Sequence, residues 1–157
     1  MDRKNSFSGD ADMPTLKAAR LHPAALLPTR KHPQDAGVDF YALEGALLPP
    51  HTVAILRTGI TIEIPAGMVG LLKPKGKSLH LLGAGVVDAG YQGEILIKVA
   101  NVTADPLTIA PGEAFAQMLL LPVFTPVVEE VSLEEIHRQQ SERGATGGIV
   151  TQFVSQD

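Results

Sequence analysis

Four short stretches of the chain combine glycine with charged or polar side chains, as anion-binding and phosphate-processing sites require. They are residues 35–42, 73–78, 83–94 and 143–148. The second stretch holds three lysines within five residues, in a chain whose formal net charge is −4. Lysine side chains, a serine hydroxyl and backbone N–H groups beside glycine can together hold an anion. Taken singly, each stretch fits a solvated loop better than a site.

The third stretch contains the strongest candidate for chemistry, Asp88 in the run GVVDAGY over residues 85–91. A carboxylate can orient and deprotonate a water beside a phosphoryl group. The alternative is that Asp88 caps the turn at Ala89-Gly90, which the residues alone favour. The five histidines are scattered without metal-ligand spacing, and His80, beside the lysines, is expected at the rim of a site.

The segments that must position these stretches have the pattern of short β-strands. Strands are predicted over residues 52–56, 59–64, 69–72, 94–100, 107–109, 116–121 and 127–131. Residues 59–64 alternate polar and apolar side chains, as in a half-buried strand. Turns are predicted at 64–67 and 110–113, where proline presets the backbone and glycine supplies a positive φ. This pattern predicts an all-β sandwich or barrel.

The two ends of the chain have a different composition from the β domain predicted over residues 14–131. Residues 1–13 are polar and lack the apolar stretch of a signal peptide, so a mobile tail is expected. Ser132 and Glu135 form a capping-box pattern, which predicts a short helix over 132–140. The glycines of residues 143–148 predict a flexible arm. Helix and arm together make up residues 132–157.

Length and composition restrict the class of protein. A chain of 157 residues, 45% hydrophobic and 19% charged, fits one globular domain. The sequence pI near 5.7 argues against broad nucleic-acid binding, and no apolar run is long enough to span a membrane. Cysteine is absent, which excludes disulfides and thiolate metal sites and suits an intracellular setting. A cytoplasmic location is expected.

The order and the amino-acid sequences of these stretches resemble the motifs of the trimeric dUTPase family over about residues 15–150. Residues 36–42 (AGVDFYA) resemble the family's first motif. Residues 85–95 (GVVDAGYQGEI) resemble the third motif over its whole length, which is the most specific similarity. Residues 111–118 (PGEAFAQM) and 143–148 (RGATGG) resemble the fourth motif and the start of the fifth.

The resemblance implies a β jelly-roll barrel assembled as a homotrimer, with active sites between subunits and the C-terminal arm reaching over a neighbour's site. The implied reaction is hydrolysis of dUTP to dUMP and pyrophosphate. It removes dUTP from the nucleotide pool and supplies dUMP for dTTP synthesis. The implied cofactor is Mg²⁺, held through phosphates and water without direct protein ligands. The implied partners are a deoxyuridine nucleotide and further copies of the chain.

The resemblance also implies roles for single residues. Asp88 would activate the water, and Tyr91 would pack against the deoxyribose and leave no room for a 2′-hydroxyl. The backbone of Gly83, Gly85 and Val86 would pair with the uracil edge and reject cytosine, because an unpaired buried polar group is costly.

A second set of residues is implied at the phosphates. Gln117 would contact phosphate, although a polar strand residue is an equal alternative. Arg143 of the arm would neutralise the terminal phosphates. Asp39 would order metal-bound water or, more in keeping with its place, support the local fold. The remaining predicted substrate contacts are Lys75, Gly76, Lys77, Ser78, Lys98, Gly144 and Ile149.

The sequence departs from the family pattern at phosphate and base contacts. The second motif, over residues 74–82, is several residues short, and its Lys75 lacks the planar fork of the usual arginine. Leu82 stands where many relatives have a uracil-binding asparagine, and Ala114 where an arginine is common. Ile149 stands where relatives place an aromatic that stacks on uracil.

These departures leave two alternatives open. A dCTP deaminase of the same superfamily would need a carboxylate base on the strand after the third motif, but Lys98 occupies that place. A non-catalytic nucleotide-binding or regulatory protein on the same fold would explain the short second motif. It would not explain why Asp88 and Arg143 are both present.

Overall fold

The computed structural model describes residues 15–83 and 85–138, and within them all regular structure is β-strand. The all-β class predicted from the sequence is confirmed. In this part of the chain no helix is long and apolar enough to cross a membrane. The strands are β1 (Lys17–Arg20), β2 (Val38–Tyr41), β3 (Ala46–Leu48), β4 (Val53–Arg57), β5 (Ile60–Glu63), β6 (Met68–Pro74), β7 (Leu81–Leu82), β8 (Gly85–Asp88), β9 (Leu96–Ala100), β10 (Leu107–Ile109) and β11 (Ala114–Pro122).

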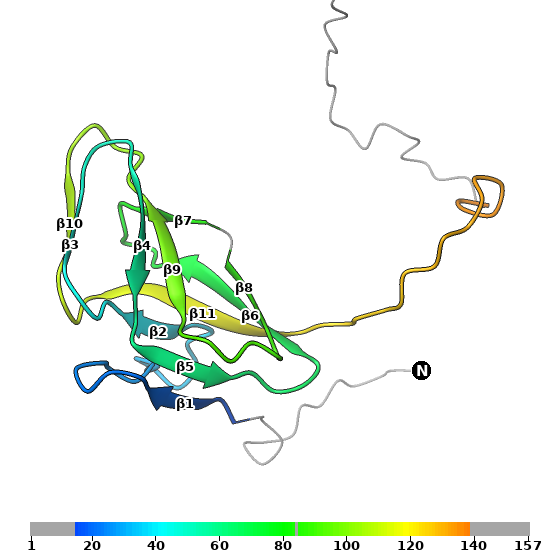
Figure 1. The fold of residues 1–157 in the computed structure, drawn as a ribbon, viewed down its shortest axis with the longest axis horizontal. Helices are drawn as coiled ribbons and strands as arrows, with labels where there is room; N and C mark the ends of the chain where they lie inside the picture. Colours follow the sequence, from blue (N-terminus) through cyan, green and yellow to red (C-terminus); the bar gives the residue numbers. More distant parts are fainter. Residues whose placement is uncertain (1–14, 84, 139–157) are drawn as a thin grey trace, which may run out of the picture. The chain divides into compact units, whose positions relative to one another are not determined.

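The strands form two main sheets and two ribbons, and every pairing is antiparallel (Figure 1). One sheet has the order β2-β11-β6-β8 and the other β4-β9-β7, while β1-β5 and β3-β10 are two-stranded ribbons. Ile97 and Val99 of β9 are buried in the same hydrophobic core as Phe115 and Met118 of β11. The two main sheets therefore pack on one core, which alternating inward side chains build.

Most of the predicted strands are present, and both predicted turns are confirmed. β4, β5, β6, β9, β10 and β11 lie where the sequence pattern placed strands. The Met68 amide donates to Pro65 O over 3.1 Å, with Gly67 at φ 78°. The strand predicted at 127–131 is wrong: Val127 and Val128 are each 94% exposed and pair with no strand of the described residues. An apolar run forms a strand only where another strand accepts its hydrogen bonds.

The second compact unit of the chain is Pro126–Asp157, described as far as residue 138. Over residues 132–138 the predicted helix does not form. The amides of Glu135 and Ile136 donate to Ser132 O, and the Glu135 carboxylate accepts from the Ser132 amide, but the turn ends at His137 with φ 57°. Short helices need a buried face, and Leu133 is exposed. The N-terminal tail and the arm at 143–148 lie outside the described residues.

Asn101, at the end of β9, ties together the loops at one end of the core. Its buried side-chain Nδ2 donates to the carbonyls of Leu48 at 2.9 Å, Pro49 at 3.1 Å and Asp105 at 2.8 Å. Its Oδ1 accepts from the amide and the hydroxyl of Thr103.

We predict that Asn101→Ala lowers the free energy of unfolding by at least about 2 kcal/mol, because buried carbonyls lose their donor. Urea unfolding at a fixed protein concentration measures this, since assembly would make stability concentration-dependent. Val102→Ala is the neighbouring control, because Val102 is exposed and should change stability by roughly 0.5 kcal/mol or less. Equal midpoints for the two variants would contradict the role given to Asn101.

Candidate active site

A turn after β8 places Asp88 and Tyr91 in one pocket. The Tyr91 amide donates to Asp88 O over 3.0 Å, and Ala89 and Gly90 form the turn between them. Asp88 and Tyr91 line a pocket of about 180 Å³ together with Gly85, Val86, Leu72, Val87, Glu94, Ile95 and Leu96. Four residues that the sequence assigned to the nucleotide therefore lie together. The volume is below the roughly 300–1,000 Å³ of complete small-molecule sites, so the pocket holds only part of a ligand.

The Asp88 carboxylate is exposed and takes no part in holding this turn. The turn closes through the backbone of Asp88, and none of the three ion pairs among the described residues includes its side chain. The carboxylate thus keeps its acceptor sites for a water at the pocket wall.

The Tyr91 ring is held at its far end. Its hydroxyl donates to Glu94 O over 2.7 Å. The neighbouring Gln92 carbonyl accepts from the Thr61 hydroxyl over 3.2 Å, which ties the segment after the turn to β5. The ring is partly exposed to solvent, so an apolar ligand surface could pack on it.

A second group of polar residues forms where β2, β11 and the end of β6 meet. Gln117 of β11 lies opposite Asp39 of β2 on one side and Lys73 of β6 on the other. The Gln117 side-chain amide donates to Pro74 O over 2.9 Å, and Lys75 forms an ion pair with Asp39. Three predicted site residues, Asp39, Lys75 and Gln117, are therefore neighbours although they are far apart in sequence.

Gly37 is required by the close approach of Gln117. A side-chain carbon at this position would overlap Gln117 Oε1 and lie 3.0 Å from its Cδ. The glycine of the first motif thus makes room for the glutamine of the fourth.

The charge of Lys75 is already compensated in this group. The Lys75 and Asp39 side chains are 21% and 13% exposed, so the ion pair is part-buried. An ammonium has three donor hydrogens, and Asp39 Oδ1 takes one of them. Lys75 can therefore bind a second anion while Asp39 fixes its position.

The other predicted contacts lie elsewhere or stay separate. Lys77 and Ser78 line a different pocket, of about 240 Å³, together with His80. His80 is buried rather than at a rim, and its Nε2 lies 2.8 Å from Phe115 O. The chain turns at this point, because the Ser78 amide donates to Lys75 O.

Gly83 and Lys98 are also neighbours, since the Gly83 amide donates to Lys98 O over 3.2 Å. Gly76 lies in the turn between Lys75 and Lys77, with no other group within 4 Å of the place a side chain would take. Arg143, Gly144 and Ile149 lie outside the described residues.

The Asp88 pocket and the Gln117 group lie far apart on the same sheet. Asp88 pairs with Val69 of β6 and Gln117 with Lys73, so the pairs are 73 − 69 = 4 residues apart, about 13 Å along a strand. Asp88 and Gln117 also lie on the two sides of β6, which adds about 9.5 Å across the sheet. The combined distance of about 16 Å is too long for both to contact one phosphoryl group.

Comparison with known proteins identifies the class to which this all-β chain belongs. The family model for dUTPase matches residues 24–147. That match covers most of the chain, and the chain is a member of the dUTPase family.

Relatives and solved structures agree with the family assignment. The chain is 38% identical over 141 residues to the deoxyuridine 5′-triphosphate nucleotidohydrolase of Mycobacterium marinum, and 39% identical to that of Mycolicibacterium gilvum. Both alignments cover 85% of this chain and 92% of the relative. The dUTPase of Staphylococcus bacteriophage 80alpha with dUpNHpp has a TM-score of 0.76 at 27% identity, covering 88% of this chain and all of that one.

A second solved structure describes a metal in a relative. This structure is of a mutant dUTPase from phage phi11 of S. aureus, and it concerns the coordination of a structural Mg(II) ion. It has a TM-score of 0.72 and 27% sequence identity to this chain. The alignment covers 78% of this chain and 99% of that chain.

Two residues next to the pocket had no role in the sequence interpretation. Glu94 follows the third motif's Gly93 and lines the pocket, so its position in the motif was an available signal. Arg57 contacts Glu94 from β4, but it lies 37 residues away and outside every motif, and its sequence context carries no signal.

We predict that Gly37→Ala displaces the Gln117 side chain without unfolding the protein. The worst overlap falls on the flexible end of the Gln117 side chain, and Gln117 Cβ, 3.2 Å away, must also shift slightly, so the cost is at least that of the Pro74 hydrogen bond, about 1 kcal/mol. The side-chain amide signal of Gln117 in a two-dimensional NMR spectrum should move toward that of a solvated glutamine. Gly76→Ala is the matched control, because open space surrounds Gly76. An unmoved Gln117 signal in Gly37→Ala would contradict the close packing.

Proposed function

We propose that this chain is a dUTP nucleotidohydrolase, which converts dUTP and water to dUMP and pyrophosphate. The observation that carries the proposal is the exposed Asp88 carboxylate, unused by the turn and in the same pocket as Tyr91. The names of the relatives support the substrate, and so does the nucleotide analogue in the phage 80alpha structure. An enzyme of this activity serves nucleotide-pool sanitation and dTTP supply, for which the cytoplasm is the proposed compartment.

In the proposed reaction Asp88 orients a water and takes its proton as the oxygen attacks the α-phosphorus. The bond between the α-phosphorus and the bridging oxygen breaks, and pyrophosphate leaves with that oxygen. A carboxylate suits this task, because its acceptor oxygens can bind the water before the proton moves. The rate then depends on how firmly neighbouring groups hold the nucleotide in line with the water.

The proposed nucleoside contacts come from the same pocket. The Tyr91 ring packs on the deoxyribose and excludes a 2′-hydroxyl, while the backbone of Gly83, Gly85 and Val86 pairs with uracil. An edge strand suits base recognition, because among the described strands β8 pairs with β6 alone and edge strands leave outer backbone groups available.

The proposed phosphate contacts come from the Gln117 group and from the arm. Lys75 keeps donor hydrogens beyond its pair with Asp39, and Gln117 lies beside it. Lys77 and Ser78 line the neighbouring pocket and would meet only a phosphate that extends toward it. Arg143 and Gly144 would close over the terminal phosphates, Ile149 would cover the base, and Lys98 would lie beside Gly83.

Mg²⁺ is the proposed cofactor, entering with the phosphates. Among the described residues no three His, Cys, Asp or Glu side chains gather as a metal site. Mg²⁺ keeps several waters and is often bound through substrate phosphates. Asp39 is the one acidic residue of the Gln117 group and would meet such an ion through water. When bound, the ion would neutralise phosphate charge.

A site shared between copies of the chain accounts for the distance of about 16 Å between its two parts. The Asp88 pocket of one subunit and the Gln117 group of another would together hold one nucleotide.

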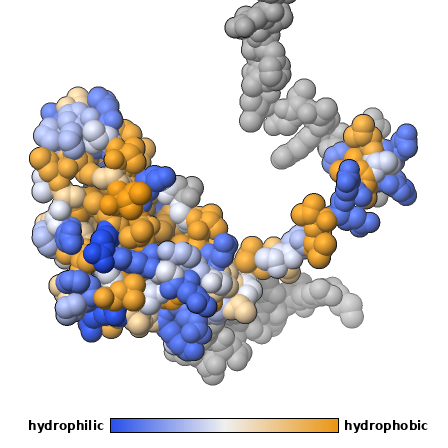
Figure 2. All heavy atoms as spheres, viewed as in Figure 1, coloured by the Kyte–Doolittle hydropathy of each residue, from blue (hydrophilic) through white to orange (hydrophobic). Residues whose placement is uncertain are grey.

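The outer face of the β4-β9-β7 sheet supports assembly, because four apolar residues on it are 49–63% exposed: Val53, Ile55, Leu81 and Leu96. Figure 2 shows hydrophobic side chains at the surface of this region, where β4 and β9 lie in Figure 1. Exposed patches of this kind mark interfaces, and a homotrimer is the proposed assembly.

We predict that a substrate panel with dUTP, dCTP, dTTP and UTP in the presence of Mg²⁺ yields pyrophosphate chiefly from dUTP. Asp88→Asn should lower kcat at least about a hundredfold, because an amide cannot take the proton. Asp105→Asn is the control, since the hydrogen bonds of Asp105 to other described residues use its backbone carbonyl and not its side chain. Ammonia release from dCTP would replace the proposal with a deaminase, and binding without turnover would replace it with a non-catalytic protein.

We further predict that two inactive variants restore activity when their subunits mix. If Asp88 and Gln117 of one site come from different subunits, a refolded equal mixture of Asp88→Asn and Gln117→Ala chains has both residues intact in about a quarter of its sites (½ × ½). Turnover near that fraction of wild type is expected. If both residues came from one subunit, the mixture would have no intact site and would stay as slow as its components.

A further inference from the structure

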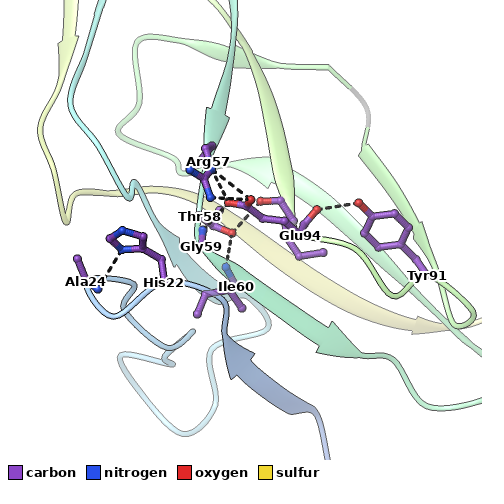
Figure 3. Close-up of polar contacts among 9 residues, drawn as sticks. His22, Ala24, Arg57, Thr58, Gly59, Ile60, Tyr91 and Glu94 are labelled. Carbon is purple, nitrogen blue, oxygen red and sulfur yellow. Dashed lines mark hydrogen bonds and ion pairs between the residues drawn. The ribbon is translucent and has the colours of Figure 1, made fainter.

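Glu94 links two strands to the wall of the Asp88 pocket. Its carboxylate accepts from the Gly59 amide over 2.7 Å and from Arg57 Nε over 3.2 Å, and a second Arg57 nitrogen lies 3.2 Å from Oε2. Its backbone carbonyl accepts a hydrogen bond from the Tyr91 hydroxyl over 2.7 Å. Figure 3 shows this arrangement, with Arg57 and Tyr91 approaching Glu94 from opposite sides.

The residues on either side of Glu94 are also hydrogen-bonded to β5 and to Thr58, which lies between β4 and β5. The Ile95 amide donates to Ile60 O over 2.8 Å, and the Thr58 hydroxyl donates to Ile95 O over 2.7 Å. These bonds hold the strand that follows Glu94, whereas the segment before it depends on Thr61 and on Glu94 itself. The carbonyl that binds Tyr91 shares a planar peptide unit with the Ile95 amide, and the Cα on its other side carries the Glu94 side chain, which Arg57 and the Gly59 amide anchor. Its position therefore depends on both anchors.

Arg57 lies outside the pocket and is next to two residues that line it, Glu94 through an ion pair and Leu96 as its partner on β9. It does not line the pocket, and its side chain is 48% exposed, whereas the Glu94 side chain is 17% exposed. A mostly buried carboxylate needs compensation, and a guanidinium fork supplies two donors in a fixed plane. Without Arg57, the Gly59 amide alone would compensate Glu94, and hydration would favour movement of the carboxylate toward solvent.

We propose that Arg57 is a positioning residue, which through Glu94 holds the Tyr91 ring against the sugar and so sets discrimination between deoxyribo- and ribonucleotides. This inference rests on the proposed function, because Tyr91 is the residue proposed to exclude a 2′-hydroxyl. A ring that can tilt admits the extra hydroxyl, whereas the Asp88 turn, held by its own backbone bond, keeps its geometry. Loss of Arg57 should therefore raise KM for dUTP and lower selectivity while kcat for dUTP stays close to wild type.

The kinetic test compares kcat/KM for dUTP and UTP in wild type, Arg57→Met, Arg57→Lys, Tyr91→Phe and the Arg57→Met, Tyr91→Phe double variant. Arg57→Met should lower the ratio roughly three- to tenfold, the range of a single hydrogen bond. Arg57→Lys keeps the positive charge but not the planar guanidinium. It should therefore have a dUTP-to-UTP ratio of kcat/KM between those of Arg57→Met and wild type. The double variant should match the more affected single variant, because both changes break one chain of contacts.

Lys17→Met is the matched control for removal of a surface cation. Lys17 pairs with Glu63 over 3.0 Å on β1 and β5, both side chains being exposed, and its loss should leave the ratio unchanged. An unchanged ratio in Arg57→Met, or effects that multiply in the double variant, would overturn the proposal.

A second measurement tests Arg57 independently of activity. The chain has two tyrosines, Tyr41 and Tyr91, and no tryptophan, so a Tyr41→Phe background leaves Tyr91 as the only tyrosine fluorophore. Arg57→Met should lower its fluorescence anisotropy and Lys17→Met should not. Equal anisotropy with and without Arg57 would overturn the proposal. Wild-type protein that leaves dUTP intact would instead overturn the proposed function, and the anisotropy would still report on Arg57.

Discussion

The pairing of β6 with both β11 and β8 is the constraint on which the site depends. Antiparallel hydrogen bonds fix the register of Gln117 opposite Lys73 and of Asp88 opposite Val69, so neither group can approach the other without breaking the sheet. The alternation that places Leu72 and Met118 in the core places Asp88 and Gln117 on the opposite face. One strand therefore both joins and separates the two groups, and the proposed assembly of several copies would bring an Asp88 pocket and a Gln117 group together.

Local stretches were the predictable part of the site. Asp88 and Tyr91 are three residues apart and share a turn, so their proximity follows from the sequence around Ala89 and Gly90. Lys77 and Ser78 show the limit of this reasoning. They were grouped with Lys75 by closeness in sequence, but the turn at Ser78 directs them into another pocket.

Features that depend on distant partners could not be predicted from the sequence. The long strands with clear apolar patterns were found, whereas β7 has only two residues and is defined by its pairing with β9. The apolar pattern at 127–131 resembles a strand, yet the structure has no strand over these residues. The helix expected after Ser132 failed for a related reason, because a capping pattern starts a turn but only tertiary contacts extend it.

The short second motif is held at both ends by neighbouring side chains, which is how it would support the proposed phosphate binding. Asp39 orients Lys75, which keeps a cation at the end of β6. A few residues on, buried His80 contacts the Phe115 carbonyl of β11 and anchors the chain as it returns toward β7. These contacts fix both ends of the shortened segment, so less backbone freedom is lost when an anion binds. In the proposed site, a preorganised lysine–aspartate pair and a buried histidine would take the place of the missing bidentate arginine.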